Sequence, residues 1–261
     1  MNSDEKAAVA EQFGVATEQV ERDHLISHLL AFLSRDFGDR IYFIGGTALA
    51  RTHLPNGRLS EDIDLVAVSD RKTVAVGVDA ALPRALARTH GRLTLDPALS
   101  SAPDTSAAIL RTSEGLTVRI QLLSSRTRTV WPTERRSLVQ RYADAPTAEL
   151  LVPTLAAFAA SKTATWFDRH ASRDLWDLWA LDRIGAIDAE AEALYRRYGP
   201  TNRPPALRDF MTAPAQADWQ NQLGGQTRLT VSPQEALTAV HNAWAQVIKP
   251  TTKAQPGPHK G

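Results

Sequence analysis

Residues 41–65 read IYFIGGTALARTHLPNGRLSEDIDL, and this stretch decides the fold. Its apolar and aromatic start, 41–44, predicts a short strand. Gly45-Gly46 ends that strand, because glycine allows sharp turns that larger residues resist. Thr47 then stands near the start of a helix, where a threonine side chain can cap free backbone N–H groups. The first half of the stretch therefore predicts a strand, a glycine turn and a helix in direct succession.

The second half of the stretch carries two aspartates beside each other on a second predicted strand. Residues 55–61 predict a polar turn, and residues 63–68 predict the strand that follows it. Asp62 and Asp64 are two positions apart, so their side chains share one face. Two carboxylates held side by side repel each other unless a cation lies between them. Mg²⁺ suits such a pair, with Mn²⁺ as the alternative ion, because both prefer oxygen ligands.

The glycine turn and the carboxylate pair together describe a nucleotide site. A glycine turn lets a phosphate approach the backbone closely, and a helix start offers it N–H donors. Taken alone, Asp-x-Asp is more often a solvated strand end, and Gly-Gly is more often a simple turn. Their occurrence in this order and spacing favours nucleotidyl transfer from a nucleoside triphosphate (NTP), in which a metal bridges phosphate oxygens.

Further elements follow from hydrophobic periodicity along the rest of the chain. The first part predicts a helix over 17–36, a helical stretch over 72–90 that restarts at Pro83, and strands over 106–112 and 116–123. The later part predicts helices over 153–169, with Pro153 in the first helical position, and over 172–184, 188–199 and 233–247. Prolines and glycines interrupt residues 200–232, which give a weaker pattern.

The order of these elements predicts an α+β protein in two parts. Residues 1–148 are expected to form a mixed sheet with flanking helices, including an N-terminal helix. Residues 149–249 are expected to form a helical bundle. Residues 250–261 are polar and rich in Pro, Gly and Lys, which predicts a disordered tail.

Four separated elements of the chain resemble the AbiEii/AbiGii (MenT-like) family of nucleotidyltransferase toxins. They are Gly45–Leu49, Arg58–Leu65, Lys162, and the run from Arg173 to Leu178, and they occur in the family's order. This resemblance covers residues 40 to 180. It implies the fold of the DNA polymerase β-like nucleotidyltransferase superfamily, a toxin–antitoxin context and a cognate antitoxin protein.

The resemblance also implies roles for individual residues. The metal ligands would be Asp62 and Asp64, which would also be catalytic. The phosphates of the nucleotide would be contacted by Gly45, Gly46, Thr47, Ser60 and Lys162. Lys162 and Asp177 would be further catalytic residues, with Asp177 in the active-site pocket.

The residues themselves leave other interpretations of the downstream elements open. Lys162 alone is more often a surface lysine with a buried stem. Arg173, Asp174 and Asp177 could form a structural ion-pair cluster on one helix face. A third carboxylate is also expected in this superfamily, yet the strand over 116–123 offers Arg119 or Gln121 at the matching place.

Arginines gathered between the two predicted parts favour contact with RNA. Arg126, Arg128, Arg135 and Arg136 lie within eleven positions, and arginine binds phosphates and stacks on bases. A solvated basic surface is the competing interpretation. The resemblance favours tRNA, since MenT-type enzymes add nucleotides to tRNA 3′ ends. His53 and the tryptophans at 166, 176 and 179 are expected to be structural.

Bulk composition excludes several classes of protein. The chain has no cysteine, which excludes disulfides and thiolate chemistry. Its net charge of +1 gives no overall attraction to polyanions, and no apolar run predicts a membrane span. We therefore expect a cytoplasmic, Mg²⁺-dependent nucleotidyltransferase that transfers a nucleoside monophosphate to an acceptor hydroxyl, at the 3′ end of tRNA, and so blocks translation. The alternatives are transfer to a small molecule or protein hydroxyl, and a catalytically inactive nucleotide-binding interaction module.

Overall fold

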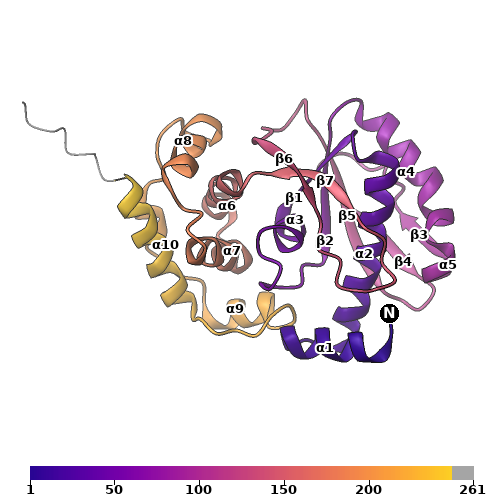
Figure 1. Cartoon of the computed structure of the whole chain (residues 1–261). Coiled ribbons are helices and arrows are strands. Elements are labelled where there is room, and N and C mark those ends of the chain that lie inside the picture. The colour runs from indigo at the N-terminus through magenta and orange to yellow at the C-terminus, as the bar shows by residue number, and fades with distance from the viewer. Residues whose placement is uncertain (249–261) are drawn as a thin grey trace, which may run out of the picture.

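A mixed sheet of seven strands forms the centre of the computed structural model, which describes residues 1–248 (Figure 1). The strands are β1 (Ile41–Ile44), β2 (Asp62–Ala67), β3 (Leu93–Asp96), β4 (Ala108–Thr112), β5 (Thr117–Ser124), β6 (Thr133–Ser137) and β7 (Glu149–Pro153). Their order across the sheet is β3-β4-β5-β2-β1-β7-β6. The strand with the two aspartates, β2, therefore lies in the middle of the sheet.

Strand pairing fixes which residues flank the aspartates. β2 is antiparallel to β1 and parallel to β5. In this register Asp62 lies beside Arg119, and Asp64 lies between Ile44 and Gln121. Because side chains alternate along a strand, the aspartates point away from the buried face that holds Ile63 and the apolar core.

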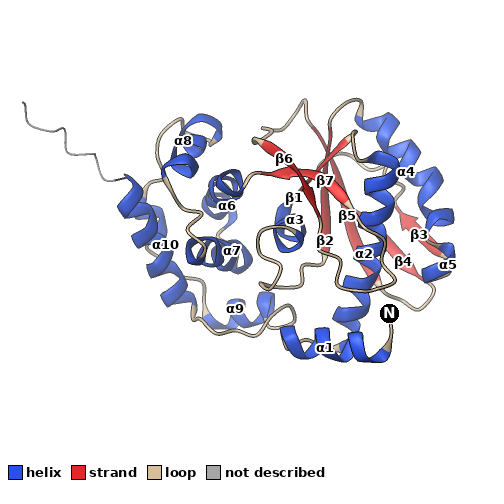
Figure 2. Cartoon of the chain, viewed as in Figure 1, coloured by secondary structure: helices blue, strands red, loops and turns tan. Residues whose placement is uncertain are grey.

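Helices cover both faces of the sheet (Figure 2). On one side lie α2 (Thr17–Phe37), α4 (Arg71–Ala85) and the short α5 (Ala87–His90), with α1 (Ser3–Phe13) packed against α2. On the other side α3 (Gly45–Arg51) packs on β1 and β2. Beyond α3 lie α6 (Leu155–Arg169), α7 (Ser172–Arg183), α8 (Ala189–Tyr198), the 3₁₀ turn η1 (Leu207–Phe210), α9 (Gln216–Leu223) and α10 (Pro233–Ile248). The α+β class expected from the sequence is confirmed.

One apolar core runs through both parts of the chain. It joins leucines of the sheet, such as Leu65, to tryptophans of the helices, such as Trp219 and Trp244. Trp166 and Trp176 are buried in it, and Trp179 packs against it, so their expected core role is confirmed. No helix among residues 1–248 is long and apolar enough to cross a membrane.

Several boundaries differ from those expected, each for a local reason. Pro153 ends β7 instead of starting α6, which begins two residues later behind the capping side chain of Thr154. Pro83 lies inside α4, and the helical stretch breaks after Ala85 instead. The sheet extends through β7, five residues past the predicted boundary at 148. The predicted disordered tail over 250–261 lies outside the described residues.

The unexpected elements are η1 and α9 in the weakly patterned stretch, α1, and the strands β3, β6 and β7. The last three are short, at four or five residues each, and β3 and β6 form the two edges of the sheet. β6 is Thr-Glu-Arg-Arg-Ser and has no buried residue, so it gives no apolar alternation.

Candidate active site

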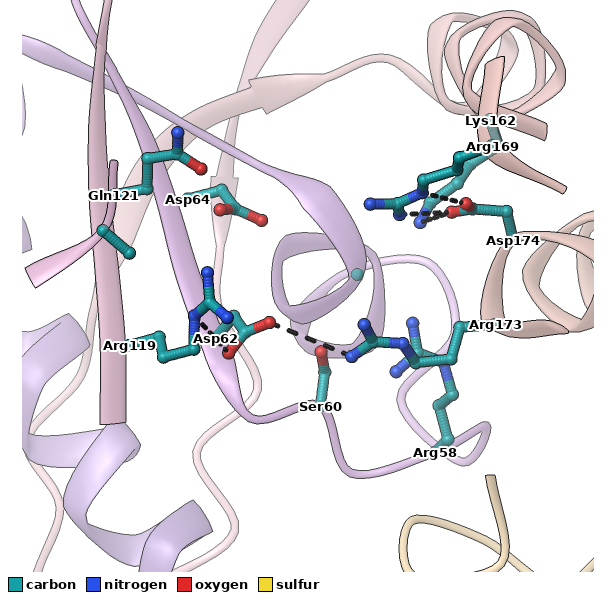
Figure 3. Close-up of a pocket in the computed structure, with 12 residues that line it drawn as sticks. Arg58, Ser60, Asp62, Asp64, Arg119, Gln121, Lys162, Arg169, Arg173 and Asp174 are labelled. Atoms are coloured by element: carbon teal, nitrogen blue, oxygen red, sulfur yellow. Dashed lines mark hydrogen bonds and ion pairs between the residues drawn. The ribbon is translucent and has the colours of Figure 1, made fainter. Parts of the chain in front are cut away.

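The two aspartates of β2 face one small polar cavity of about 210 Å³ (Figure 3). Asp62 and Asp64 both line it, with Gly46 from the glycine turn and Ser60 from the loop before β2. Among the described residues, the carboxylate of Asp64 accepts no hydrogen bond and forms no ion pair within 4.0 Å. The nearest cationic atoms to Asp62 lie 3.9 Å away on Arg119 and Arg173. The carboxylates thus have free oxygen lone pairs directed into a cavity.

The electrostatic environment of Asp64 favours a bound cation. Burial of the Asp64 carboxyl, together with the neighbouring carboxylate of Asp62, raises its pKa to about 6. Lys162 and two arginines act in the opposite direction without cancelling that effect. A divalent cation between the two carboxylates would remove the repulsion, so the oxygen donors here fit Mg²⁺ or Mn²⁺.

Glycine is required where β1 turns into α3, because the carboxylate occupies the space of a side chain. Gly45 has φ +80°, and a Cβ there would overlap the carboxylate of Asp64. A Cβ at Gly46 would overlap the guanidinium of Arg58 and lie 3.1 Å from Ser60 Oγ. The turn therefore packs directly on the site residues. Thr47 is buried, and its hydroxyl donates to the backbone carbonyl of Asp62 instead of facing the cavity.

Cationic side chains of the helices form the opposite side of the cavity, and one further cation lies beside Asp62. Lys162 and Arg169 come from α6, Arg173 comes from α7, and Arg119 comes from β5 beside Asp62 (Figure 3). With Arg58, five cations line the cavity against three carboxylates, the third being Asp174. Both oxygens of Asp174 are paired, with Lys162 at 3.1 Å and with Arg169 at 2.7 and 3.1 Å. The lining therefore carries excess positive charge, which suits a polyphosphate.

Asp177 lies behind this cavity and does not line it. Its carboxylate accepts two parallel hydrogen bonds from Arg58, at 2.8 and 2.9 Å, and an ion pair from Lys162 at 2.6 Å. Burial raises the pKa of Asp177, but the Arg58 and Lys162 charges outweigh burial and bring the pKa down to about 2. Asp177 is thus an ionised anchor that fixes two residues of the lining.

The place of an expected third carboxylate is held by an amide. Gln121 lies beside Asp64 in the parallel register and lines the cavity. Its Nε2 donates to the backbone carbonyl of Asp104 at 3.1 Å, which holds the side chain in place. Neither Gln121 nor Arg119 can supply a carboxylate oxygen. Asp62 and Asp64 are therefore the acidic groups of this cavity that have no close hydrogen-bond donor among the described residues.

A larger cavity of about 920 Å³ adjoins the first and shares Gly46, Asp64, Lys162 and Arg169 with it. Its remaining lining is partly aromatic and includes Gly45, Phe158, Trp131 and Tyr198. The rings of Trp131 and Tyr198 lie 5.8 Å apart, at 48° to each other. Aromatic faces beside a cationic cavity are suited to a nucleobase, since every base can stack.

Comparison with known proteins identifies the family. The family model described as the nucleotidyl transferase AbiEii toxin of type IV toxin–antitoxin systems matches residues 29–246. The chain belongs to the AbiEii family. It is therefore a toxin nucleotidyltransferase, a class that takes an NTP as substrate and has a cognate antitoxin. No curated protein matches the chain in sequence.

Solved structures show the AbiEii fold in the same arrangement. MenT4, a nucleotidyltransferase toxin from Mycobacterium tuberculosis H37Rv, is 24% identical, with a TM-score of 0.65 over 94% of this chain and 89% of MenT4. A putative nucleotidyltransferase from H. pylori is 15% identical, with a TM-score of 0.52 over 89% of this chain and 96% of that one. Both likenesses concern the fold, which extends over nearly the whole chain.

Part of this AbiEii site was not found by sequence reasoning. Arg169 lies seven residues after Lys162, which is about two helical turns. That spacing puts both side chains on one face of α6, and it is the signal from which Arg169 could have been predicted. Arg173 lies among acidic residues on one helix face, which equally indicates a structural ion-pair cluster. Gln226 was missed because it lies in the weakly patterned stretch, yet its Oε1 accepts from Arg58 at 2.6 Å.

The arginines predicted to bind RNA differ in their surroundings. Arg128 lines the larger cavity. Arg126, two residues before it, is exposed and lines neither cavity. Arg135 pairs with Asp39 at 2.6 Å, away from both cavities. Arg136 lies 3.2 Å from the ring of His53, which lines neither cavity. Of the four arginines, only Arg128 is positioned at the described cavities.

Proposed function

We propose that this AbiEii-family toxin transfers a nucleoside monophosphate from an NTP to the hydroxyl at the 3′ end of tRNA and thereby blocks translation. The observation that carries this proposal is that Asp62 and Asp64 lie side by side opposite an excess of cations, Asp64 without a partner and Asp62 with no cationic atom nearer than 3.9 Å. Carboxylates for a metal and cations for a triphosphate are the two requirements of nucleotidyl transfer.

Asp62 and Asp64 would hold the metal, Mg²⁺ or Mn²⁺, through their free oxygens. When bound, such an ion supplies Lewis-acid stabilisation of the charge that develops on the α-phosphate. The observation behind this assignment is the Asp64 carboxylate, which is largely enclosed and has no protein partner among residues 1–248. A carboxylate in that position needs a counter-charge, and the cavity is open to provide it.

Cations from the helices would hold the triphosphate. Lys162, Arg169 and Arg173 project into the cavity from α6 and α7, opposite the carboxylates. Arg169 and Arg173 keep part of their donor capacity free, since their recorded partners occupy only some of their N–H groups. The nucleoside and the acceptor end would occupy the larger cavity, near Trp131 and Tyr198.

The chemistry requires little from general bases. The acceptor oxygen bonds to the α-phosphorus, and the bond to the pyrophosphate oxygen breaks. Gln121, an amide, cannot take the hydroxyl proton, and Asp62 and Asp64 would hold the metal. The proton would therefore pass to solvent. Positioning and charge stabilisation then provide most of the rate enhancement, as in other phosphoryl transfers.

The experiment incubates the protein with each labelled NTP and total tRNA. Wild-type protein is expected to label RNA, and Asp62→Ala is expected to label nothing while folding normally. Asp218→Ala removes an exposed aspartate of α9 and is expected to behave as wild type. Asp62→Ala is also expected to relieve any growth arrest caused by expression.

Other outcomes would replace the proposal. Label in protein or in a small molecule would show a different acceptor. Absence of NTP turnover under all conditions would show an inactive nucleotide-binding interaction module. Equal labelling by wild type and a well-folded Asp62→Ala would remove the assigned metal site.

A further inference from the structure

Three histidines from two helices meet on the side of the sheet opposite the active site. His24 and His28 lie one turn apart on α2, and His90 is the last residue of α5. One ligand nitrogen from each ring lies within 4.8 Å of the other two. Asp144, from the loop between β6 and β7, joins them: each of its oxygens lies 3.0 Å from His24 Nε2. No residue of the proposed catalytic site belongs to this group.

Hydrogen bonding within the protein does not account for this convergence. A neutral imidazole has one donor and one acceptor nitrogen, and here the Nε2 atoms of His24 and His28 face each other at 3.2 Å. His90 Nε2 is enclosed and has no hydrogen-bond partner among the described residues. Buried polar atoms usually have partners, so the unpartnered nitrogen of His90, beside two further imidazoles and a carboxylate, points to a cation bound among them.

The spacing of the group matches a tetrahedral metal site. Zinc binds imidazole nitrogen and carboxylate oxygen at about 2.0–2.2 Å, which places neighbouring ligand atoms about 3.3 Å apart. The distances here are 3.2 Å between the two α2 histidines, 3.0 Å from His24 to Asp144, and 3.9 Å from His28 to Asp144. The ligand nitrogen of His90 lies within 4.8 Å of those of His24 and His28, so His90 would move closer to complete such a site.

Protonation states also suit a metal. Burial lowers the pKa of His28, and it lowers that of His90 to about 4, with further lowering from neighbouring histidines. Burial raises the pKa of Asp144, but hydrogen bonds from the N-terminal amine and His24 outweigh burial and bring the pKa to about 2. Near pH 7 the two rings are neutral and the carboxylate is ionised, which are the forms that bind metals.

We propose that His24, His28, His90 and Asp144 form a structural Zn²⁺ site. Imidazole ligands select Zn²⁺ over Mg²⁺, so this site would differ in metal from the pair Asp62 and Asp64. The ion would link α2, α5 and the loop before β7. The N-terminal amine of Met1 also contacts Asp144 and lies 3.5 Å from His24 Nε2, so it now places a positive charge where the metal would bind.

The test measures Zn²⁺ bound per chain by isothermal titration and by elemental analysis after dialysis. The protein carries no histidine tag, and it carries Asp62→Asn and Asp64→Asn so that active-site carboxylates do not contribute. One equivalent of Zn²⁺ is expected. His24→Ala with His90→Ala is expected to lose it, whereas His170→Ala with His241→Ala, at one exposed and one half-buried histidine outside this group, keeps it.

Two further measurements separate loss of metal from loss of folding. Circular dichroism in EDTA is expected to give the same spectrum for both double variants. Co²⁺ in place of Zn²⁺ is expected to give the visible absorption of a tetrahedral complex, and Zn²⁺, unlike Mg²⁺, is expected to raise the melting temperature. Absence of stoichiometric Zn²⁺ in the folded protein, or its retention after loss of His24 and His90, would overturn the site.

Discussion

At the scale of single residues, the most consequential interaction is the buried ion pair between Arg58 and Asp177. Their side chains are 3% and 2% exposed, and their two hydrogen bonds are parallel. Lys162 shares the same carboxylate. A pair removed from water in this way stabilises a protein only while every charge in it has a partner. Asp177 therefore holds in place two cations, Arg58 and Lys162, that line the cavity of the candidate active site.

Asp177→Ala is expected to destabilise the fold by about 3–5 kcal/mol, because it leaves Arg58 buried without a carboxylate. Urea unfolding at pH 7 measures this change as a lower midpoint. The matched variant Asp218→Ala, at an exposed aspartate, is expected to change the free energy of unfolding by less than about 0.5 kcal/mol. Equal midpoints for both variants would contradict the role given to the buried pair.

The same carboxylate gives stability a defined dependence on pH. Its pKa is lowered from the ordinary value of 3.8 to about 2 in the folded protein. The stabilisation is therefore complete above pH 4 and is lost as pH falls from 4 towards 2. The difference in unfolding free energy between wild type and Asp177→Ala should be largest at pH 7 and should shrink below pH 4. Urea titrations at pH 7, 4 and 3 measure it, and a constant difference would exclude this origin.

At the scale of elements, the turn between β1 and α3 sets the position of the carboxylate pair. Gly45 has φ +80° and packs against Asp64, while Gly115 has φ +90° and has open space around it. Both glycines adopt the backbone region that disfavours side chains by roughly 1–2 kcal/mol. The two positions therefore differ in their surroundings and not in backbone strain.

Gly45→Ala is expected to abolish nucleotide transfer, because the added methyl group displaces the Asp64 carboxylate. Gly115→Ala, in the β4–β5 turn, is expected to lower stability by a similar backbone cost but to keep activity. The labelled-NTP assay, run beside thermal unfolding, distinguishes the two effects. Full activity in Gly45→Ala would show that the turn does not position Asp64.

The elements that sequence could predict are those with a strong local signal. The carboxylate pair followed from a two-residue period, and long helices such as α2 and α7 followed from apolar periodicity. The edge strand β6 could not be predicted, since its stability comes from pairing with β7 and not from buried side chains. Four of the five cations that line the site come from residues more than fifty positions away from Asp64, and only tertiary packing brings them there.

At the scale of the whole molecule, the loop between α9 and α10 contacts the loop between α3 and β2. Gln226 accepts the backbone N–H of Leu59 at 2.8 Å and a hydrogen bond from Arg58 at 2.6 Å. Thr227 donates to the carbonyl of Gly57 at 2.8 Å. These contacts, with the continuous apolar core, join the sheet and the helices into one packed unit.

Unfolding is expected to be a single transition as a result. Five of the six tryptophans lie beyond residue 153, so fluorescence reports the helices, whereas circular dichroism reports the whole chain. The two probes should give superimposable urea curves. An earlier fluorescence transition would show that the helices unfold independently of the sheet, and it would contradict the coupling through Gln226 and the core.

The contacts of Gln226 and Thr227 also set a limit on when the toxin can become active during its synthesis. Chains leave the ribosome from the N-terminus, and domains fold as their residues emerge. The two aspartates emerge early, but the cations of α6 and α7 follow only from residue 162 onward, and the support for Arg58 comes last. A nascent chain therefore carries the two aspartates without the helical cations opposite them, so the ribosome that makes the chain completes most of it before this cavity is assembled.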